Sequence, residues 1–530
     1  MDDKHLIERM LADPKTTRRQ FVVGAVAAGM TASAAGGVWD QAQAATPKRG
    51  GHLKCGLNDM NTGDSLDPAT WNATGMIVIG RAVRDSLVEV GQDSTAQPGL
   101  AESWEASADA KTWRFKLRPG VEFSNGKSLT TEDVINSINV HRGEDSKSGA
   151  KGVFAGIADV TADGKDTIVV TLSGGNADFP FLMTDYHMNV VPTVDGKADV
   201  LSPIGTGLYT LDAFDPGIRV ELSRNPNAWQ QDAFGYVDSA EITAILDDSA
   251  RQNALMTGQV DLINRPALST IHLLTRNPNI KIQAVPSNLM FTMPMHVNTA
   301  PFDSLELRMA LKHAMNRQAF VDKILFGYGV MGNDQPIGPG FQYHDPDLPQ
   351  NDFDLDKAKS LVSKAGMDGV TVPYHVSDTA FGGALDAAQL FQADLAKIGV
   401  NLDIIREPKD GYWNNVWNKK PFCACYWGPR PVEDMILSIA YTSEAPWNDS
   451  RINIARVDEL VAAARAELDP AKRREMYAEV QMLISTQGGT IIPAFGQDVA
   501  GLNKKVQHGQ LGGGWEMDGG HFIKRWWLDA

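Results

Sequence analysis

The stretch LAESWEASADAKTWRFKLRPGVEFSNGKSLTTEDVINSINVHR, residues 100–142, decides the fold of this chain. Between residues 113 and 117, apolar and charged side chains alternate, the period of two that is typical of a strand with one buried face. The tripeptides RPG and SNG that follow are turn sequences. Thr130 with Asp133 three residues later is a helix-capping pattern. The stretch therefore predicts a strand hairpin followed by a capped helix.

Further along, the chain alternates helices and strands. After residue 354 the pattern predicts a helix (358–365), a strand (370–376), a second helix (384–398) and a second strand (400–405). Such alternation is typical of parallel strands joined by helices. The second half therefore predicts an α/β lobe.

Several helix boundaries can also be expected. Asp303 with Glu306, Asn316, and Asp469 before Pro470 are candidate N-terminal caps. Near the start, residues 76–90 predict one helix with an apolar stripe.

Length, charge and cysteine usage limit the possible functions. The 530 residues predict two or three domains. The formal charge of −16 argues against nucleic-acid binding, which needs a basic surface. Three cysteines, Cys55, Cys423 and Cys425, are too few for a disulfide scaffold. We expect the last two to pack in a core on one face of a strand.

The N-terminus predicts export. Twin arginines at 18 and 19 precede an Ala- and Gly-rich run, and Ala42-Gln43-Ala44 offers a cleavage site after Ala44. A surface helix or membrane anchor is the alternative. Lys54 before Cys55 fits poorly with lipid attachment, and no later apolar run reaches about 18 residues. We therefore expect a mature protein that is free in the periplasm of a Gram-negative bacterium.

Several motifs resemble those of the extracytoplasmic solute-binding proteins of family 5, from peptide, nickel and opine ABC importers. They are LAESWE, TWRFKLRPGVEFSNG and LTTEDV in the opening stretch, GTGLY at 205–209, NPNAW at 225–229, ALMTGQVDL at 254–262 and PFDSLELRMALKHAMNRQ at 301–318. The resemblance covers essentially the whole mature chain. It implies an α/β, periplasmic-binding-protein-like fold, with two hinged lobes and an additional subdomain in the first lobe.

The family's discontinuous first lobe gives the domain plan. The expected division is a signal peptide at 1–44, lobe I at 45–80, 205–295 and 497–530, its extra subdomain at 81–204, and lobe II at 296–496.

Two segments of the first lobe hold candidate ligand-binding residues. Trp71 and Asn72 follow the LDP motif, in a loop that faces the ligand cleft in the family. The alternative for Trp71 is packing at the edge of the lobe. Tyr186 beside His187 pairs an aromatic ring with a tunable donor, which suits a polar organic ligand. The alternative for His187 is an ordinary core or surface histidine.

A third candidate segment, 425–434, lies among seven tryptophans that follow residue 410. It follows a strand, where open α/β lobes place ligand loops, and contains Tyr426, Trp427 and Arg430. Peptide-binding members have an aspartate in this loop that holds a ligand ammonium, and here Pro429-Arg430 occupies its place. An arginine fork suits a carboxylate and repels an ammonium. Tryptophan clusters also serve packing, which is the alternative for Trp427.

The resemblance implies the substrate-binding component of an ABC importer, which captures a peptide, an opine or a similar small organic zwitterion or anion by lobe closure. We expect permease and ATPase partners, a monomer, no catalysis, and no cofactor or metal. One alternative is a periplasmic enzyme exported by the twin-arginine route, although the sequence lacks a G-x-S-x-G elbow and its G-x-G-x-x-G at 327–332 follows a helix. Another is nickel or metal-chelate binding through the scattered histidines His187, His296, His344 and His375.

Overall fold

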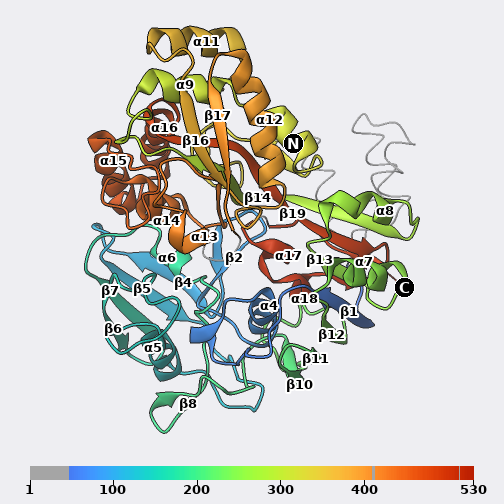
Figure 1. Ribbon diagram of the computed structural model, residues 1–530. Coiled ribbons are helices and arrows are strands. Elements are labelled where there is room, and N and C mark those ends of the chain that lie inside the picture. Colours follow the sequence, from blue (N-terminus) through green and yellow to red (C-terminus); the bar gives the residue numbers. More distant parts are fainter. Residues whose placement is uncertain (1–46, 409–411, 513, 530) are drawn as a thin grey trace, which may run out of the picture.

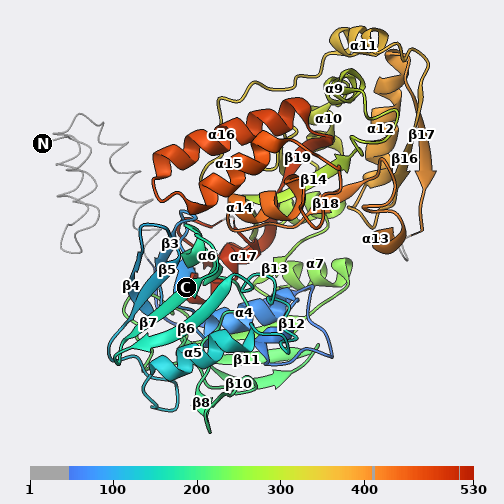
Figure 2. The ribbon, with the colours of Figure 1, turned by 90° about the vertical axis from the view of Figure 1, so that its left-hand side faces the viewer.

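The computed structural model describes residues 47–408, 412–512 and 514–529, so the predicted signal peptide and its cleavage site lie outside the described residues. Two bodies of mixed helix and strand lie one above the other in Figures 1 and 2. The upper body contains the long helices α9 (Leu305–His313), α11 (Leu355–Lys364), α12 (Ala384–Lys397), α15 (Ala455–Ala466) and α16 (Pro470–Gln487). We call it the second lobe and the lower body the first lobe.

Two long antiparallel strands run from one lobe to the other. They are β14 (Ile280–Pro294) and β19 (Thr490–Asn503), paired from Ile280 opposite Asn503 to Pro294 opposite Thr490. Leu502 lies in the core of the first lobe, whereas Met293 lies in that of the second. The register shifts between Pro286 and Met290, an irregularity that bends a strand pair. The lobes therefore meet at a bent two-stranded crossing.

The crossing strands belong to a nine-stranded sheet with the order β10-β11-β12-β1-β13-β19-β14-β18, in which β15 also pairs with β19. The bounds of the remaining members are β1 (His52–Leu57), β10 (Tyr209–Asp215), β11 (Arg219–Arg224), β12 (Ser239–Ala244), β13 (Leu262–Asn264), β15 (Gly329–Met331) and β18 (Cys425–Trp427). The first lobe thus supplies the strands from β10 to β13, and the second lobe supplies β18 at the opposite edge of the sheet.

The opening stretch folds as predicted. Strands β4 (Ala101–Ala106) and β5 (Thr112–Leu117) form a hairpin, which continues into a four-stranded sheet with β7 (Thr167–Leu172) and β6 (Ile157–Asp163). Helix α5 (Thr131–Val140) follows. Thr130 Oγ1 accepts a hydrogen bond from the Asp133 N–H, and Asp133 Oδ2 accepts one from the Thr130 N–H at 2.9 Å, so the capping prediction is confirmed.

The predicted α/β alternation in the second lobe is also confirmed. Strands β16 (Thr371–Val376) and β17 (Asn401–Arg406) pair in parallel, and α12 packs on both. Asn316 caps α10 (Arg317–Lys323) and Asp469 caps α16 as predicted, but α9 is capped by Ser304 and not by Asp303. The Ser304 hydroxyl accepts from the Leu307 N–H at 3.2 Å, which places the first turn one residue later.

The helix predicted over 76–90 is wrong in its second half. Helix α4 (Thr74–Val83) ends before Arg84, whose backbone is extended. The Arg84 guanidinium is buried and donates to the Leu66 carbonyl at 3.0 Å and the Ser202 carbonyl at 2.7 Å. Val88–Val90 then forms strand β2, paired with β3 (Ala96–Pro98).

Buried apolar side chains gather in separate clusters. One draws on segments 53–83, 208–262 and 500–526, a second on 87–190, and a third on 291–424 with Ile491 and Ala494. The division into a first lobe, its subdomain (81–204) and a second lobe stays a proposal, which these separate clusters support. Cys423 and Cys425 are buried in core clusters as expected, but in two different clusters of the second lobe and not on one face of a strand, and Cys55 is also a buried thiol. Within the described ranges, no helix has the length and apolar character needed to cross a membrane.

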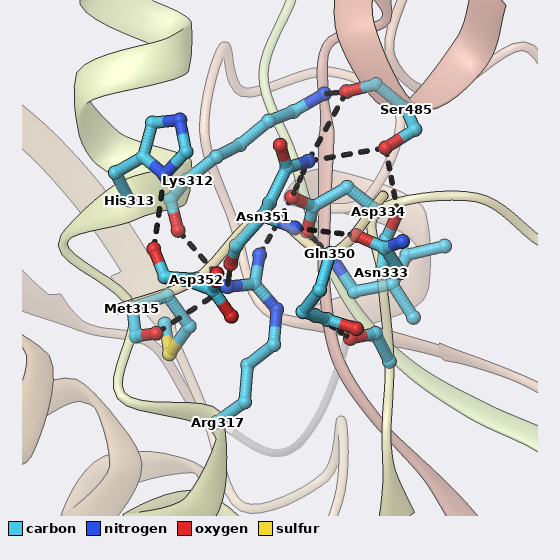
Figure 3. A network of polar contacts seen from close by, with 12 residues as sticks. Lys312, His313, Met315, Arg317, Asn333, Asp334, Gln350, Asn351, Asp352 and Ser485 are labelled. Atoms are coloured by element: carbon cyan, nitrogen blue, oxygen red, sulfur yellow. Dashed lines mark hydrogen bonds and ion pairs between the residues drawn. The ribbon is translucent and has the colours of Figure 1, made fainter. Parts of the chain in front are cut away.

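A buried polar network ties the second lobe together (Figure 3). Arg317 and Asp334, 3% and 0% exposed, form an ion pair at 2.6 Å. Asp334 also accepts from Asn351 Nδ2 and from the Ile492 N–H, both at 2.9 Å. Asn351 Nδ2 in turn donates to Ser485 Oγ at 3.1 Å. The network joins α10, the 333–352 segment, α16 and β19.

Candidate functional site

A cavity of about 920 Å³ lies between the two lobes, next to the crossing strands. This volume is at the upper end of the roughly 300–1,000 Å³ range of small-molecule sites. Polar lining residues come from both lobes and the crossing. They include Arg81, Asp185, Tyr186, His187, Trp515, Asp518, His521 and Arg525 from the first lobe, Asn288 from β14, and Arg430, Asp434, Ser438 and Arg465 from the second lobe.

Tyr186 and His187 line the cavity as a stacked pair, with ring centroids 4.1 Å apart. His187 Nδ1 lies 2.6 Å from Asp185 Oδ1, and Nε2 lies 2.9 Å from the Trp71 carbonyl oxygen. Both ring nitrogens therefore have a hydrogen-bonding partner, which fixes the orientation of the ring. Burial raises the pKa of Tyr186 to about 12, Asp185 adds to the rise, and Arg430 opposes it.

Arg430 reaches the cavity from the second lobe, on the loop after β18. Its backbone carbonyl accepts from Asn288 Nδ2 at 3.0 Å, which fixes the loop to the crossing. Its Nη1 donates to the carbonyls of Gly428 and Pro429, both at 3.1 Å. Burial lowers the pKa of Arg430 from its ordinary value, and Tyr186 and Asp185 oppose this shift from across the cavity. A second-lobe guanidinium therefore faces a first-lobe aromatic and carboxylate pair.

Trp427 and Tyr426 lie beside the cavity and outside its lining. Trp427 is 4% exposed, packs in the second-lobe core and donates from Nε1 to Asp449 Oδ2 at 3.3 Å. Tyr426 is 43% exposed, with its ring 5.6 Å from that of Trp413. The cavity wall next to Trp427 is formed by Trp447, whose ring lies 6.0 Å from that of Trp427.

Trp71 and Asn72 also lie outside the lining. Trp71 is 3% exposed, donates from Nε1 to the Ser65 carbonyl at 2.9 Å and packs against Gly80, where any Cβ would overlap its ring. Asn72 is exposed. The geometry favours the packing alternative for Trp71, whose carbonyl supports His187.

Sequence reasoning missed several lining residues. Arg81 lies on α4, Asp518 on α17 (Glu516–Gly519) and Arg525 on α18 (Phe522–Arg525), and none belongs to a recognisable ligand motif. Trp447 and Trp515 were indicated only as members of the late tryptophan cluster. Asn288 gave no signal in the sequence.

The lobes also touch directly at the subdomain. Asp178, just before α6 (Phe179–Leu182), forms an ion pair with Arg473 of α16 at 2.5 Å, and the two side chains are 4% and 6% exposed. The Arg473 guanidinium lies over the rings of Tyr343 and Tyr477, at 5.0 and 5.5 Å. Beside this pair, the Ala177 N–H donates to the Arg465 carbonyl at 2.7 Å. We call these contacts the interlobe clamp.

Glu433, at the start of α14 (Glu433–Ile436), predicts a pH dependence. Burial raises its pKa to about 7 from an ordinary value of 4.5, Asp178 adds to the rise, and the Tyr343 N–H opposes it. A raised folded-state pKa gives stability that is fully present below 4.5 and lost as pH rises through 7. We expect thermal stability to fall across this window, by up to about 1.4 kcal/mol per pH unit for one proton.

Melting temperatures of the wild type and Glu433→Gln between these pH values measure the effect. The variant keeps an acceptor for Tyr343 and should show a shallower slope. The slope should not vanish, because burial also raises the pKa of Asp449 to about 6 and of Asp498 to about 8. Equal slopes in both proteins would contradict the assignment.

The four histidines considered for metal binding lie on separate elements. His187 lines the cavity, and His296 hydrogen-bonds to the Pro421 carbonyl through its backbone N–H and not through its ring. The ring of His344 bonds the Ile337 carbonyl, and the ring of His375 bonds Glu407. In the described part of the chain, no three His, Cys, Asp or Glu side chains are grouped so that they could hold a metal ion.

Comparisons with known proteins agree on one family. The model of the bacterial extracellular solute-binding proteins, family 5 middle, matches residues 95–449. The dipeptide-binding protein of Escherichia coli K12 is 24% identical over 460 residues, covering 77% of this chain and 83% of that protein. The di/tripeptide-binding protein 1 of Pseudomonas aeruginosa is 26% identical over 466 residues, covering 80% and 85%.

Among solved structures, HbpA2 from Haemophilus parasuis has a TM-score of 0.80 at 22% identity and covers 91% of this chain and 100% of that one. The two-lobed α/β architecture expected from the sequence is confirmed by this likeness.

Proposed function

Because this chain belongs to family 5 of the bacterial extracellular solute-binding proteins, we propose that it captures a small organic anion or zwitterion between its lobes and delivers it to an ABC permease. The observation that supports this most is the cavity, whose walls come from both lobes and which places Arg430 opposite Asp185 and Tyr186. A ligand that touches both walls stabilises the closed arrangement, because an open protein offers it only one wall.

Several finer features belong to the same proposal. The protein is exported by its twin-arginine signal, acts in the periplasm as a monomer, and releases its ligand chemically unchanged to a membrane permease with ATPase subunits. Two relatives are named for dipeptides and di/tripeptides, so peptides belong in a first ligand screen beside opines and other organic anions.

The test begins with the compound that co-purifies with the protein, identified by mass spectrometry and titrated back calorimetrically. We expect Arg430→Ala to weaken its binding by about tenfold to a hundredfold, since hydrogen bonds to charged groups contribute roughly 1.5–3 kcal/mol. The control is Arg406→Ala, which removes an exposed positive charge of the second lobe on β17. Equal affinities for the Arg430 variant and the wild type would reject the role of Arg430.

A further inference from the structure

We propose that the ligand is an amphipathic anion, with a carboxylate or similar head group that carries no neighbouring ammonium and is attached to a bulky apolar or aromatic body. This assignment rests on the proposed solute-binding function and narrows its substrate class. Two properties of the cavity support it: the way in which its charges are paired, and the composition of its remaining walls.

Each carboxylate of the cavity has a basic partner, although Asp518 Oδ2 is buried without a hydrogen bond. The pairs are Asp434 with Arg465 at 3.0 Å, Asp518 with Arg525 at 3.4 Å, and Asp185 with His187 at 2.6 Å. Asp434 and Asp518 are also buried. A ligand ammonium would have to displace one of these partners or remain without a counter-charge, and a buried unpaired charge is costly.

Two guanidiniums in the lining, in contrast, have no carboxylate partner. Arg430 donates only to the backbone carbonyls of its own loop. Arg81 donates to Ser86 Oγ at 3.0 Å and to the Thr184 carbonyl, and its Nε is buried without a partner. Across the described ranges, no carboxylate lies within ion-pair distance of either one.

Asp185 is the carboxylate of the lining that acts on the pKa of both guanidiniums. Glu89, which is paired with Lys524, also acts on the pKa of Arg81. The hydrogen-bonding partner of Asp185 is His187. The lining therefore has more positive than negative charge that is free to engage a ligand. An anionic head group would complete it, and a carboxylate fits the planar fork of an arginine.

The remaining walls are mainly apolar and come from both lobes. Val153 and Leu182 pack against the subdomain core, and Ile439 packs against a core of the second lobe. Trp447 is 44% exposed, which leaves ring surface for a ligand to cover. Gly156 adds room, because a Cβ placed there would meet no atom within 4 Å. Such walls are best covered by an apolar or aromatic body.

Four probes separate head group from body, titrated into the full mature protein after its co-purifying compound has been removed. N-benzoylphenylalanine has both features, and its carboxamide lacks the charge. Phenylalanylphenylalanine is similar in bulk but adds an ammonium, and N-acetylglycine keeps the head group without the body. We expect N-benzoylphenylalanine to raise the melting temperature and to bind at least about tenfold more tightly than each of the others.

Two variants locate the parts of the ligand. Arg81→Gln should reduce the ratio of affinities for N-benzoylphenylalanine and its carboxamide, which measures the contribution of the charged head group. Trp447→Ala should reduce the ratio of affinities for N-benzoylphenylalanine and N-acetylglycine, which measures the contribution of the apolar body. The melting temperature of each unliganded variant verifies that it folds, and Ile439→Ser provides a second change in the apolar wall.

A larger melting shift with phenylalanylphenylalanine, or no shift with N-benzoylphenylalanine, would overturn the amphipathic-anion assignment. The solute-binding function would stand in either case if the co-purifying compound bound and reduced the radius of gyration. If that compound also failed to bind, the proposed function itself would fail.

Discussion

The Arg473→Met variant is expected to favour separated lobes and to bind its ligand on the order of a hundredfold more weakly, because it breaks the interlobe clamp. Asp178 and Arg473 are 4% and 6% exposed and belong to different lobes. Removing one partner of a buried ion pair costs roughly 3–5 kcal/mol, since the other charge stays buried and unpaired. Here the molecule can avoid that cost by opening, which returns the Asp178 carboxylate to water.

Small-angle scattering of the unliganded protein and calorimetric titration measure the two consequences. The radius of gyration should rise and the affinity should fall together, because a ligand that needs the closed form must first supply the free energy of closure. Asp178→Asn, on the other lobe, should act in the same direction.

The matched control is Arg456→Met, which breaks an exposed ion pair with Glu479 at 2.8 Å between α15 and α16, inside the second lobe. The substitution is also Arg→Met and also lies in the α15–α16 pair, but the broken contact does not join the lobes. The radius of gyration and the affinity should therefore stay unchanged. An Arg473→Met protein that scatters and binds like this control would show that the clamp does not hold the lobes together.

Elements that depend on local chemistry could be predicted from the sequence. The alternation around Trp113 and the Thr130 and Asp133 cap concern neighbours within a few residues, and both are confirmed. The end of α4 could not be predicted, since it depends on Arg84 finding carbonyls at Leu66 and Ser202. Nothing near residue 84 indicates where those acceptors will lie.

The same distinction applies to the cavity. The loop containing Arg430 could be located because it follows a strand, and the structure places that side chain in the lining. The burial of Trp427 depends on Asp449 and Trp447, further along the chain. Arg81 and Asp518 come together only because the C-terminal segment returns to α4. The proposal on ligand class rests on which charges of the cavity are paired. Such pairs join residues that are far apart in the sequence, so no local sequence pattern predicts them.

Asp334→Asn is expected to destabilise the second lobe by about 3–5 kcal/mol, lowering its melting temperature by on the order of 10 °C. The asparagine has nearly the same shape but leaves the Arg317 guanidinium, 3% exposed, without a counter-charge. The two oxygens of Asp334 accept hydrogen bonds from Asn351 Nδ2 and from the Ile492 N–H. In asparagine one of these acceptor oxygens is replaced by an NH2 group, which is a donor. At least one of these groups would then lose its partner.

Differential scanning calorimetry, with tryptophan fluorescence to follow the second lobe, measures the loss. Asp403→Asn is the control, because it neutralises an exposed carboxylate on β17.

The Arg317→Met, Asp334→Leu double variant should recover part of the stability, since it removes both charges together. Full recovery is not expected, because the Ile492 N–H would still lack its acceptor. Since Arg317 and Asp334 lie outside the cavity lining, ligand affinity well below the melting temperature should stay at the wild-type value. An Asp334→Asn protein as stable as the control would show that the ion pair is not what holds α10 to β19.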